Sequence, residues 1–197
     1  GAPDNGEGLH VRNLVGLEGS SLRVTNSDMT ENAIVILDNA VLNPELDSGV
    51  TDPARVGTDT IMGGSIIGGE AVTFIKEGTG TLTVGGTMDV ETLALREGTI
   101  VLNGASNTLD ALTLEGGGLT INGNAEVGTI TGTEAGGTLI IQGTLNLTGT
   151  GEINDGSITG TGTLRIQEGA ELALGGEARL DGTSVTADGT LALSGTE

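Results

Sequence analysis

A short pattern recurs along the second half of the chain: two apolar residues one residue apart, with glycine close behind. Such alternation places both apolar side chains on one side of a β-strand, and glycine follows too soon for the ten or more residues of a helix. Five blocks begin with this pattern at intervals of 19, 27, 25 and 27 residues: Thr92–Leu95, Ala111–Leu114, Thr138–Ile141, Thr163–Ile166 and Thr190–Leu193. After a corner, a second alternating segment follows in four of them: Ile100 with Leu102, Leu119 with Ile121, Leu145 with Leu147, and Leu172 with Leu174.

Strands this short are not stable alone, but repeated copies stacked on one another bury their apolar faces in a common interior. Glycine at the corners supplies backbone conformations that other residues resist, as at Gly98, Gly116 to Gly118, Gly143 and Gly169. We therefore predict an all-β fold, a right-handed single-stranded parallel β-helix (solenoid) with about 19–27 residues per turn. Extra short strands around Ile130, Ile158 and Val185 would make the longer turns wider or give them a protruding corner.

The second apolar residue of each opening segment should be buried and stacked in neighbouring turns. This predicted ladder consists of Leu95, Leu114, Ile141, Ile166 and Leu193.

The composition favours a long, thin core. Phe74 is the only aromatic residue, whereas a round core usually buries several aromatic side chains. The apolar fraction of 36% and its regular placement argue against disorder, and glycine does not recur every third residue as in collagen. A sandwich of two sheets is the structural alternative, because regularly spaced short strands also suit it. Sandwich cores, however, do not repeat their sequence from one rung to the next.

The N-terminal part of the chain, 1–70, is less regular, with strands expected at 22–25, 33–37, 61 and 66–67. Residues 43–60 hold two of the three prolines and break the pattern, which predicts a loop that projects from one continuous solenoid spanning residues 1–197; a disordered insertion is the alternative. Loops on a rigid scaffold often carry recognition, so deletion of residues 44–59 should weaken binding and leave the fold intact. The candidate interaction residues in this loop are Asn43, Asp47, Asp52, Arg55 and Asp59.

The charge and the residue types exclude several classes of function. The net charge is −20 and the seven basic residues are scattered, so nucleic acid and anionic membranes are poor partners. Cysteine is absent, which excludes disulfides and thiolate sites and suits a chain that crosses a periplasm unfolded. No apolar run of transmembrane length and no signal-peptide pattern is found, and the two ends of the sequence look like cut points in a longer chain.

Residues 73–104 hold two related glycine-flanked halves. The first contains Lys76, Gly78, Gly80, Leu82, Val84 and Gly86, and the second contains Gly98, Thr99, Ile100, Leu102 and Gly104. These residues closely resemble the autotransporter-associated β-strand repeat, whose style is Leu-x-Lys-x-Gly-x-Gly-x-Leu-x-Leu-x-Gly followed by Gly-Thr-Leu-x-Leu-x-Gly. The motif covers about a sixth of the chain, and the looser segments after it extend the likeness to over half. The Tyr-x-Gly-Gly centre of that repeat and the aromatic residues of an autochaperone region are absent.

The resemblance implies an internal segment of a bacterial autotransporter passenger. Such a segment would be secreted to the Gram-negative cell surface through a C-terminal barrel that lies outside this chain. Its expected role is that of a structural stalk with an adhesive or self-associating, virulence-type function. The expected partners are a host-cell or bacterial surface receptor, or further copies of itself.

The sequence shows no recognisable catalytic or metal-binding pattern. His10 stands alone near the N-terminus, without a partner for general acid–base chemistry. The nonapeptide and EF-hand calcium motifs are absent, and glycine-rich stretches such as 78–80 lack the rest of a phosphate loop. Glu77, Glu97, Glu115 and Glu168 precede corner glycines and suit a solvated rim. We therefore expect no enzyme activity, no cofactor and no defined metal site.

The placement of threonine suggests a second functional class, a solenoid that binds ice. Outward threonines on stacked rungs form the flat ladders by which some β-solenoids bind ice, and Thr-x-Thr groups occur at 81–83, 129–133 and 159–163. These groups do not occur at the same position in every aligned block, as a flat ice-binding surface would require. Three hypotheses follow: an adhesive passenger segment, a solenoid that binds ice or glycan, and a polysaccharide-active β-helix enzyme with paired carboxylates in a groove.

Overall fold

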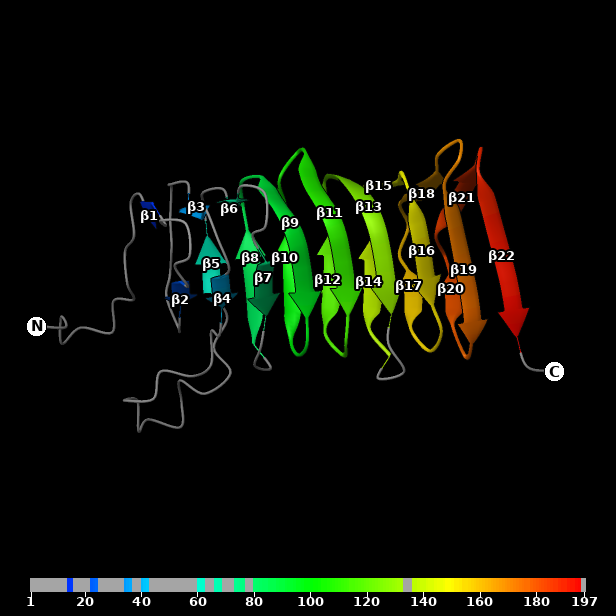
Figure 1. Ribbon diagram of the computed structural model, residues 1–197, viewed down its shortest axis with the longest axis horizontal. Coiled ribbons are helices and arrows are strands. Elements are labelled where there is room, and N and C mark those ends of the chain that lie inside the picture. Colours follow the sequence, from blue (N-terminus) through cyan, green and yellow to red (C-terminus); the bar gives the residue numbers. More distant parts are fainter. Residues whose placement is uncertain are drawn as a thin grey trace, which may run out of the picture.

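The computed structural model is an all-β coil of parallel strands whose turns stack along one long axis (Figure 1). It describes residues 80–132 and 136–195 throughout, together with strands at 14–15, 22–24, 34–36, 40–42, 60–62, 66–68 and 73–76. Within these ranges no helix is present, and hence none that could span a membrane. The predicted all-β parallel solenoid is confirmed.

Each turn of the solenoid has three flat faces. Face one is a sheet of strands β5, β8, β10, β12, β14, β17 and β20. Faces two and three belong to a second sheet, because β9, β11 and β13 each run across both of them without a break. On either side of these long strands, separate short strands form the two faces.

The strand bounds follow the coil in chain order. Face one consists of β5 Thr60–Met62, β8 Thr81–Val84, β10 Thr99–Leu102, β12 Gly118–Ile121, β14 Thr138–Ile141, β17 Ser157–Thr159 and β20 Arg179–Asp181. The three strands shared by faces two and three are β9 Met88–Leu95, β11 Asn107–Leu114 and β13 Asn124–Gly132. Face two also has β1 Leu14–Val15, β3 Ile34–Ile36, β6 Ile66–Gly68, β15 Thr144–Leu147, β18 Thr163–Ile166 and β21 Ser184–Ala187. Face three also has β2 Leu22–Val24, β4 Ala40–Leu42, β7 Thr73–Lys76, β16 Thr150–Ile153, β19 Glu171–Gly176 and β22 Thr190–Gly195.

The length of one turn follows from the strand pairing on face one. Thr99 pairs with Thr81 one turn before it and with Gly118 one turn after it, so the residue number advances by 18 and then by 19. The longest step on face one between positions 80 and 195 joins Ser157 to Arg179, where the residue number advances by 22. Between positions 80 and 195 the turns therefore lie at the lower end of the predicted range, whereas the residue number advances by 32 from Ile34 to its partner Ile66 in the N-terminal part.

The longer intervals between the sequence blocks arise because the faces resemble one another in sequence. Thr138, Thr144 and Thr150 open three successive faces, six residues apart. Each of the longer intervals is thus one turn plus one further face. Strands do lie at Ile130, Ile158 and Val185, as predicted, but they are ordinary faces of narrow turns and do not widen them.

The core consists of aliphatic columns that run along the axis. On face one, Leu82, Ile100, Leu119, Leu139 and Ile158 stack in register, and every one of them is fully buried. The burial of such a side chain contributes about 1.5–3 kcal/mol. Because each side chain lies between its counterparts in the turns above and below, the core grows by a similar increment with every turn.

The predicted ladder is only partly correct. Leu95 and Leu114 do stack on face three, but the next residue in that column is Gly132. Ile141 lies on face one and Ile166 on face two, so neither continues the column, although both are buried. Leu193 does belong to the column of Leu95 and Leu114, which continues through Gly132, Ile153 and Leu174, but it is 72% exposed and not buried as predicted. At each of the three long intervals, the next block of the sequence alignment lies on the next face of the solenoid and not on the same face.

A column of glycines forms the corner after face one: Gly86, Gly104, Gly123, Gly143 and Gly162. A Cβ atom on Gly104, Gly123, Gly143 or Gly162 would overlap the carbonyl oxygen of the preceding glycine in this column. Close approach of the backbones, rather than a special dihedral angle, therefore requires glycine here. Among the predicted corner glycines, Gly98 (φ 67°) and Gly169 (φ 82°) do have the expected left-handed dihedral angle.

Candidate functional site

The residues that the sequence suggested for interaction cannot be assigned to a site. Asn43, Asp47, Asp52, Arg55 and Asp59 lie outside the described residues, and so does His10.

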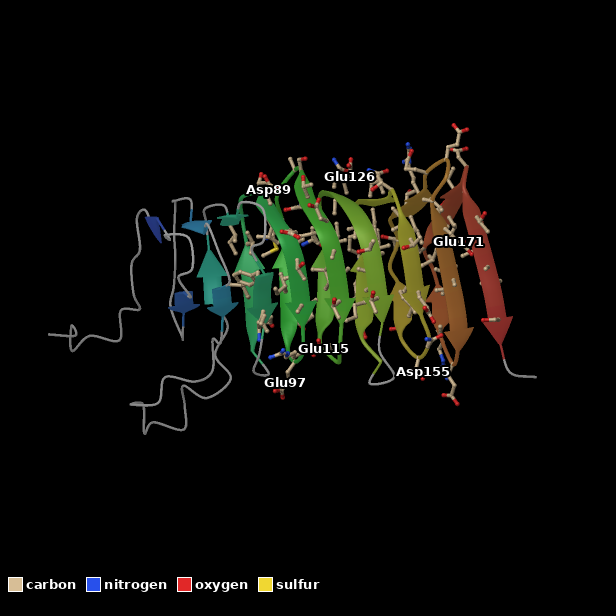
Figure 2. The ribbon with its side chains drawn as sticks, viewed as in Figure 1. Asp89, Glu97, Glu115, Glu126, Asp155 and Glu171 are labelled. Carbon is tan, nitrogen blue, oxygen red and sulfur yellow. The ribbon has the colours of Figure 1, made fainter. Side chains whose placement is uncertain are left out.

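Carboxylates line the edges of the solenoid. Figure 2 shows Asp89 and Glu126 along one edge, and Glu97, Glu115 and Asp155 along the opposite edge. Glu115 accepts a hydrogen bond from Arg96 across one turn (Oε2 to Nε, 3.2 Å), with both side chains substantially exposed. An exposed ion pair of this kind contributes little to stability. Within residues 80–132 and 136–195, no three metal-ligating side chains come together.

Two polar side chains are buried among the described residues, Lys76 and Asn107. Lys76 points inward at the level of Leu95, and its Nζ lies 3.5 Å from the carbonyl oxygen of Glu97. Asn107 accepts a hydrogen bond from Met88 N (3.0 Å) and donates to the carbonyl oxygens of Gly104 (3.1 Å) and Asn124 (2.8 Å). Since Met88, Asn107 and Asn124 belong to three consecutive turns, this amide ties those turns together.

The two halves of the glycine-flanked motif occupy the same place in successive turns. Leu82 stacks on Ile100 and Val84 on Leu102, while Gly86 and Gly104 are neighbours in the glycine column. Each half of the motif therefore corresponds to one strand of face one and the glycine corner that follows it. Gly78 lies outside the described residues.

Face one carries an outer surface without ionisable groups over five turns. On β8, β10, β12, β14 and β17, buried residues alternate with partly exposed ones. The partly exposed positions form two columns in register, and we call these ten residues the uncharged face: Thr81, Thr99, Gly118, Thr138 and Ser157, and beside them Thr83, Val101, Thr120, Ile140 and Thr159.

A row of neutral polar side chains borders the uncharged face, and we call it the amide edge. It consists of Asn103, Asn122, Gln142 and Thr161, all exposed. Asn122 Nδ2 donates to Asn103 Oδ1 (2.7 Å), and Thr161 Oγ1 donates to Gln142 Oε1 (2.8 Å). Each amide has more donors and acceptors than these bonds use.

The sequence did not reveal this surface, because the blocks were aligned across different faces. Thr81, Thr83 and Thr159 do lie together on the outer side of face one, Thr81 in one column and Thr83 and Thr159 in the other. Thr129 and Thr131 lie on face three, and Thr163 lies on face two. Thr133 is outside the described residues. Alignment of each segment with the segment one turn later, as β8 pairs with β10, would have placed the residues of each column at equivalent positions.

An apolar hollow of about 390 Å³ lies at the last described turn. Leu174, Leu180 and Leu193 contribute to its lining. Leu180 and Leu193 are the two exposed large apolar residues of the described part of the chain.

Comparison with known proteins adds no relative from which a role could be transferred. No family model matches the chain, and no curated protein and no solved structure has a significant match to it.

Proposed function

We propose that this chain is a structural, surface-exposed segment of a secreted autotransporter-type passenger, which presents an adhesive or self-associating face. The observation that carries the proposal is the parallel solenoid in which the two halves of the glycine-flanked motif occupy equivalent places on face one of two successive turns. In such a rod, recognition takes place on an extended surface. The chain then needs no convergent acid, base or nucleophile, and we propose that it is not an enzyme.

Two further features support delivery to a cell surface. The chain has no cysteine, so disulfides cannot lock it before export. Its stability comes from one turn stacking on the next, which allows folding to proceed along the axis as the chain emerges. A right-handed coil belongs to this proposal, because parallel strands of one sheet are nearly always joined by right-handed crossovers.

The test is to place the chain between a signal peptide and a membrane barrel and to express it in a Gram-negative host. We expect the chain to be accessible to antibody on intact cells and to increase either cell settling or attachment to host cells, relative to the barrel alone. Leu114→Asp, which disrupts the core, is the matched control and should abolish the gain. A folded, surface-accessible chain that changes neither property would contradict the adhesive role.

A further inference from the structure

The three faces of the solenoid differ in charge, although the whole chain carries −20. Face two bears Asp89, Glu126 and Arg165 in one outward column. Face three is uncharged on its outer side from β9 to β13, but Glu152 and Glu171 then stand exposed on β16 and β19. The uncharged face continues over five turns and ends at β20, where Arg179 and Asp181 enter its two columns.

From this contrast we infer that the uncharged face is a homotypic interface, through which a second copy of this chain binds face to face. The inference rests on the proposed function and names the partner and the surface of its self-association. Two molecules of this charge repel one another. The approach of one uncharged face to another removes the fewest carboxylates from water and brings the fewest of them together.

The geometry of the uncharged face suits a copy of itself better than an irregular partner. Its rungs repeat at the strand spacing of about 4.8 Å, and two stacked sheets pack about 10 Å apart. A second copy has the same period by construction, so side chains of one face meet equivalent gaps along the whole length of the other. The β-branched threonine, valine and isoleucine side chains have few rotamers and lose little freedom on contact.

The amide edge adds polar contacts at the border of the same interface. Asn103, Asn122 and Gln142 are exposed, and the hydrogen bonds along the edge leave part of their donor and acceptor capacity for a partner. Side-chain amides and β-branched residues in stacked, identical rows are the combination that pairs β-sheets in dry zippers.

The size of the face predicts weak, multivalent binding. Five strands about 4.8 Å apart and four residues of about 3.3 Å each give roughly 300 Å² per copy, whereas a standard interface buries about 800 Å² per partner. A single pair of chains should therefore associate weakly. Many copies on one surface would bind through avidity.

The experiment uses beads densely coated with the full chain. Lys76 is the only lysine and is buried, so amine coupling favours the N-terminal amine and one orientation. We expect the beads to cluster, and Thr99→Glu/Thr120→Glu to slow clustering about tenfold or more, because like charges would then face each other. Raising the salt concentration should speed clustering of the parent, since it screens the carboxylates on the edges.

The matched control is Thr92→Glu/Thr113→Glu on face three. Thr92 and Thr113 have the same relation to each other across β9 and β11 as Thr99 and Thr120 have across β10 and β12. This variant should cluster like the parent, and equal melting temperatures would show that both variants are folded. Clustering that responds equally to both variants, or parent beads that do not cluster, would overturn the inference.

Ice binding is tested in the same samples. Inhibition of ice recrystallisation that only Thr99→Glu/Thr120→Glu removes, without bead clustering, would assign the face to ice and overturn the homotypic interface. Failure of export in cells would contradict the proposed function alone, because the beads require no secretion.

Discussion

At the corner after face one, consecutive turns approach so closely that a single methyl group decides whether they fit. The backbone of Gly123 lies against the carbonyl oxygen of Gly104, and Gly143 lies in the same way against Gly123. Backbone atoms cannot move aside as the end of a flexible side chain can. Glycine is therefore required at these positions by the geometry of the folded state. Elsewhere glycine usually lowers stability, because it gives the unfolded chain more conformational entropy.

Gly123→Ala should lower the free energy of unfolding by about 2–4 kcal/mol, because the added Cβ forces two turns apart. Gly118→Ala is the control, since its Cβ would meet Thr99 Oγ1 at an ordinary 3.5 Å. That substitution should leave stability within about 1 kcal/mol of the parent. Urea denaturation measures both, and equal effects would show that the corner is less tight than described.

Leu114 and Leu193 test the core at single positions. Leu114→Asp places a charge in a column with no water to solvate it, and we expect cooperative unfolding to be lost. Leu193→Asp changes a side chain that is 72% exposed and should shift stability by less than about 1 kcal/mol. Thermal melts followed by circular dichroism compare the two, and a normal melt for Leu114→Asp would mean that this residue faces solvent.

At the scale of the strand, the three faces are so similar that a strand could pair with its neighbour in the wrong register. An apolar column tolerates such a slip, because leucine meets leucine on every face. Asn107 does not, because its amide finds Met88 N and the Gly104 and Asn124 carbonyls only when three turns are correctly aligned. A buried polar group left without these partners costs about 1–3 kcal/mol.

Asn107→Leu keeps the size of the side chain and removes its hydrogen bonds to three backbone groups. We expect a loss of about 2–4 kcal/mol and a less cooperative transition, measured by urea denaturation. In the control, Asn124→Leu, an exposed amide loses one hydrogen bond to Ala105 O, and the effect should stay below about 1 kcal/mol. If Asn107→Leu proved as stable as the parent, aliphatic packing alone would specify the register.

The sequence predicted the strands better than their relation to one another. The segments at 138–141 and 163–166 match β14 and β18, because alternation and glycine are local signals. The face on which each strand lies depends on the length of every turn before it. Because successive faces begin only six residues apart, as at Thr138 and Thr144, a slip by one face keeps the same pattern. The uncharged face was missed for this reason, since its columns exist only in the correct register.

At the scale of the whole molecule, far-UV circular dichroism should give a β spectrum with negligible helix, because strands of alternating burial fill residues 80–132 and 136–195. A helical content above roughly a fifth would contradict the solenoid.

Amide hydrogen exchange should reveal a gradient along the rod. Amides of β10, β12 and β14 lie between paired strands on both sides and should exchange only on global unfolding. The side chains of β20 are all exposed, and Leu180 is 37% exposed, so the strands β20 to β22 should exchange faster through local opening. Uniform protection would mean that the last turn is as stable as the middle.

The hydrogen bonds between turns run along the long axis of the rod, as from Asn122 N to Leu102 O and from Gln142 N to Ile121 O. A pulling force along that axis loads all the bonds between two turns together, while the turns themselves carry the force in series. The weakest junction then sets the breaking force, whatever the number of turns. On face one, the pairing between neighbouring strands shortens from four residues to three from β14 onward, so this face contributes least to the junctions there. Added turns therefore lengthen the tether without strengthening it.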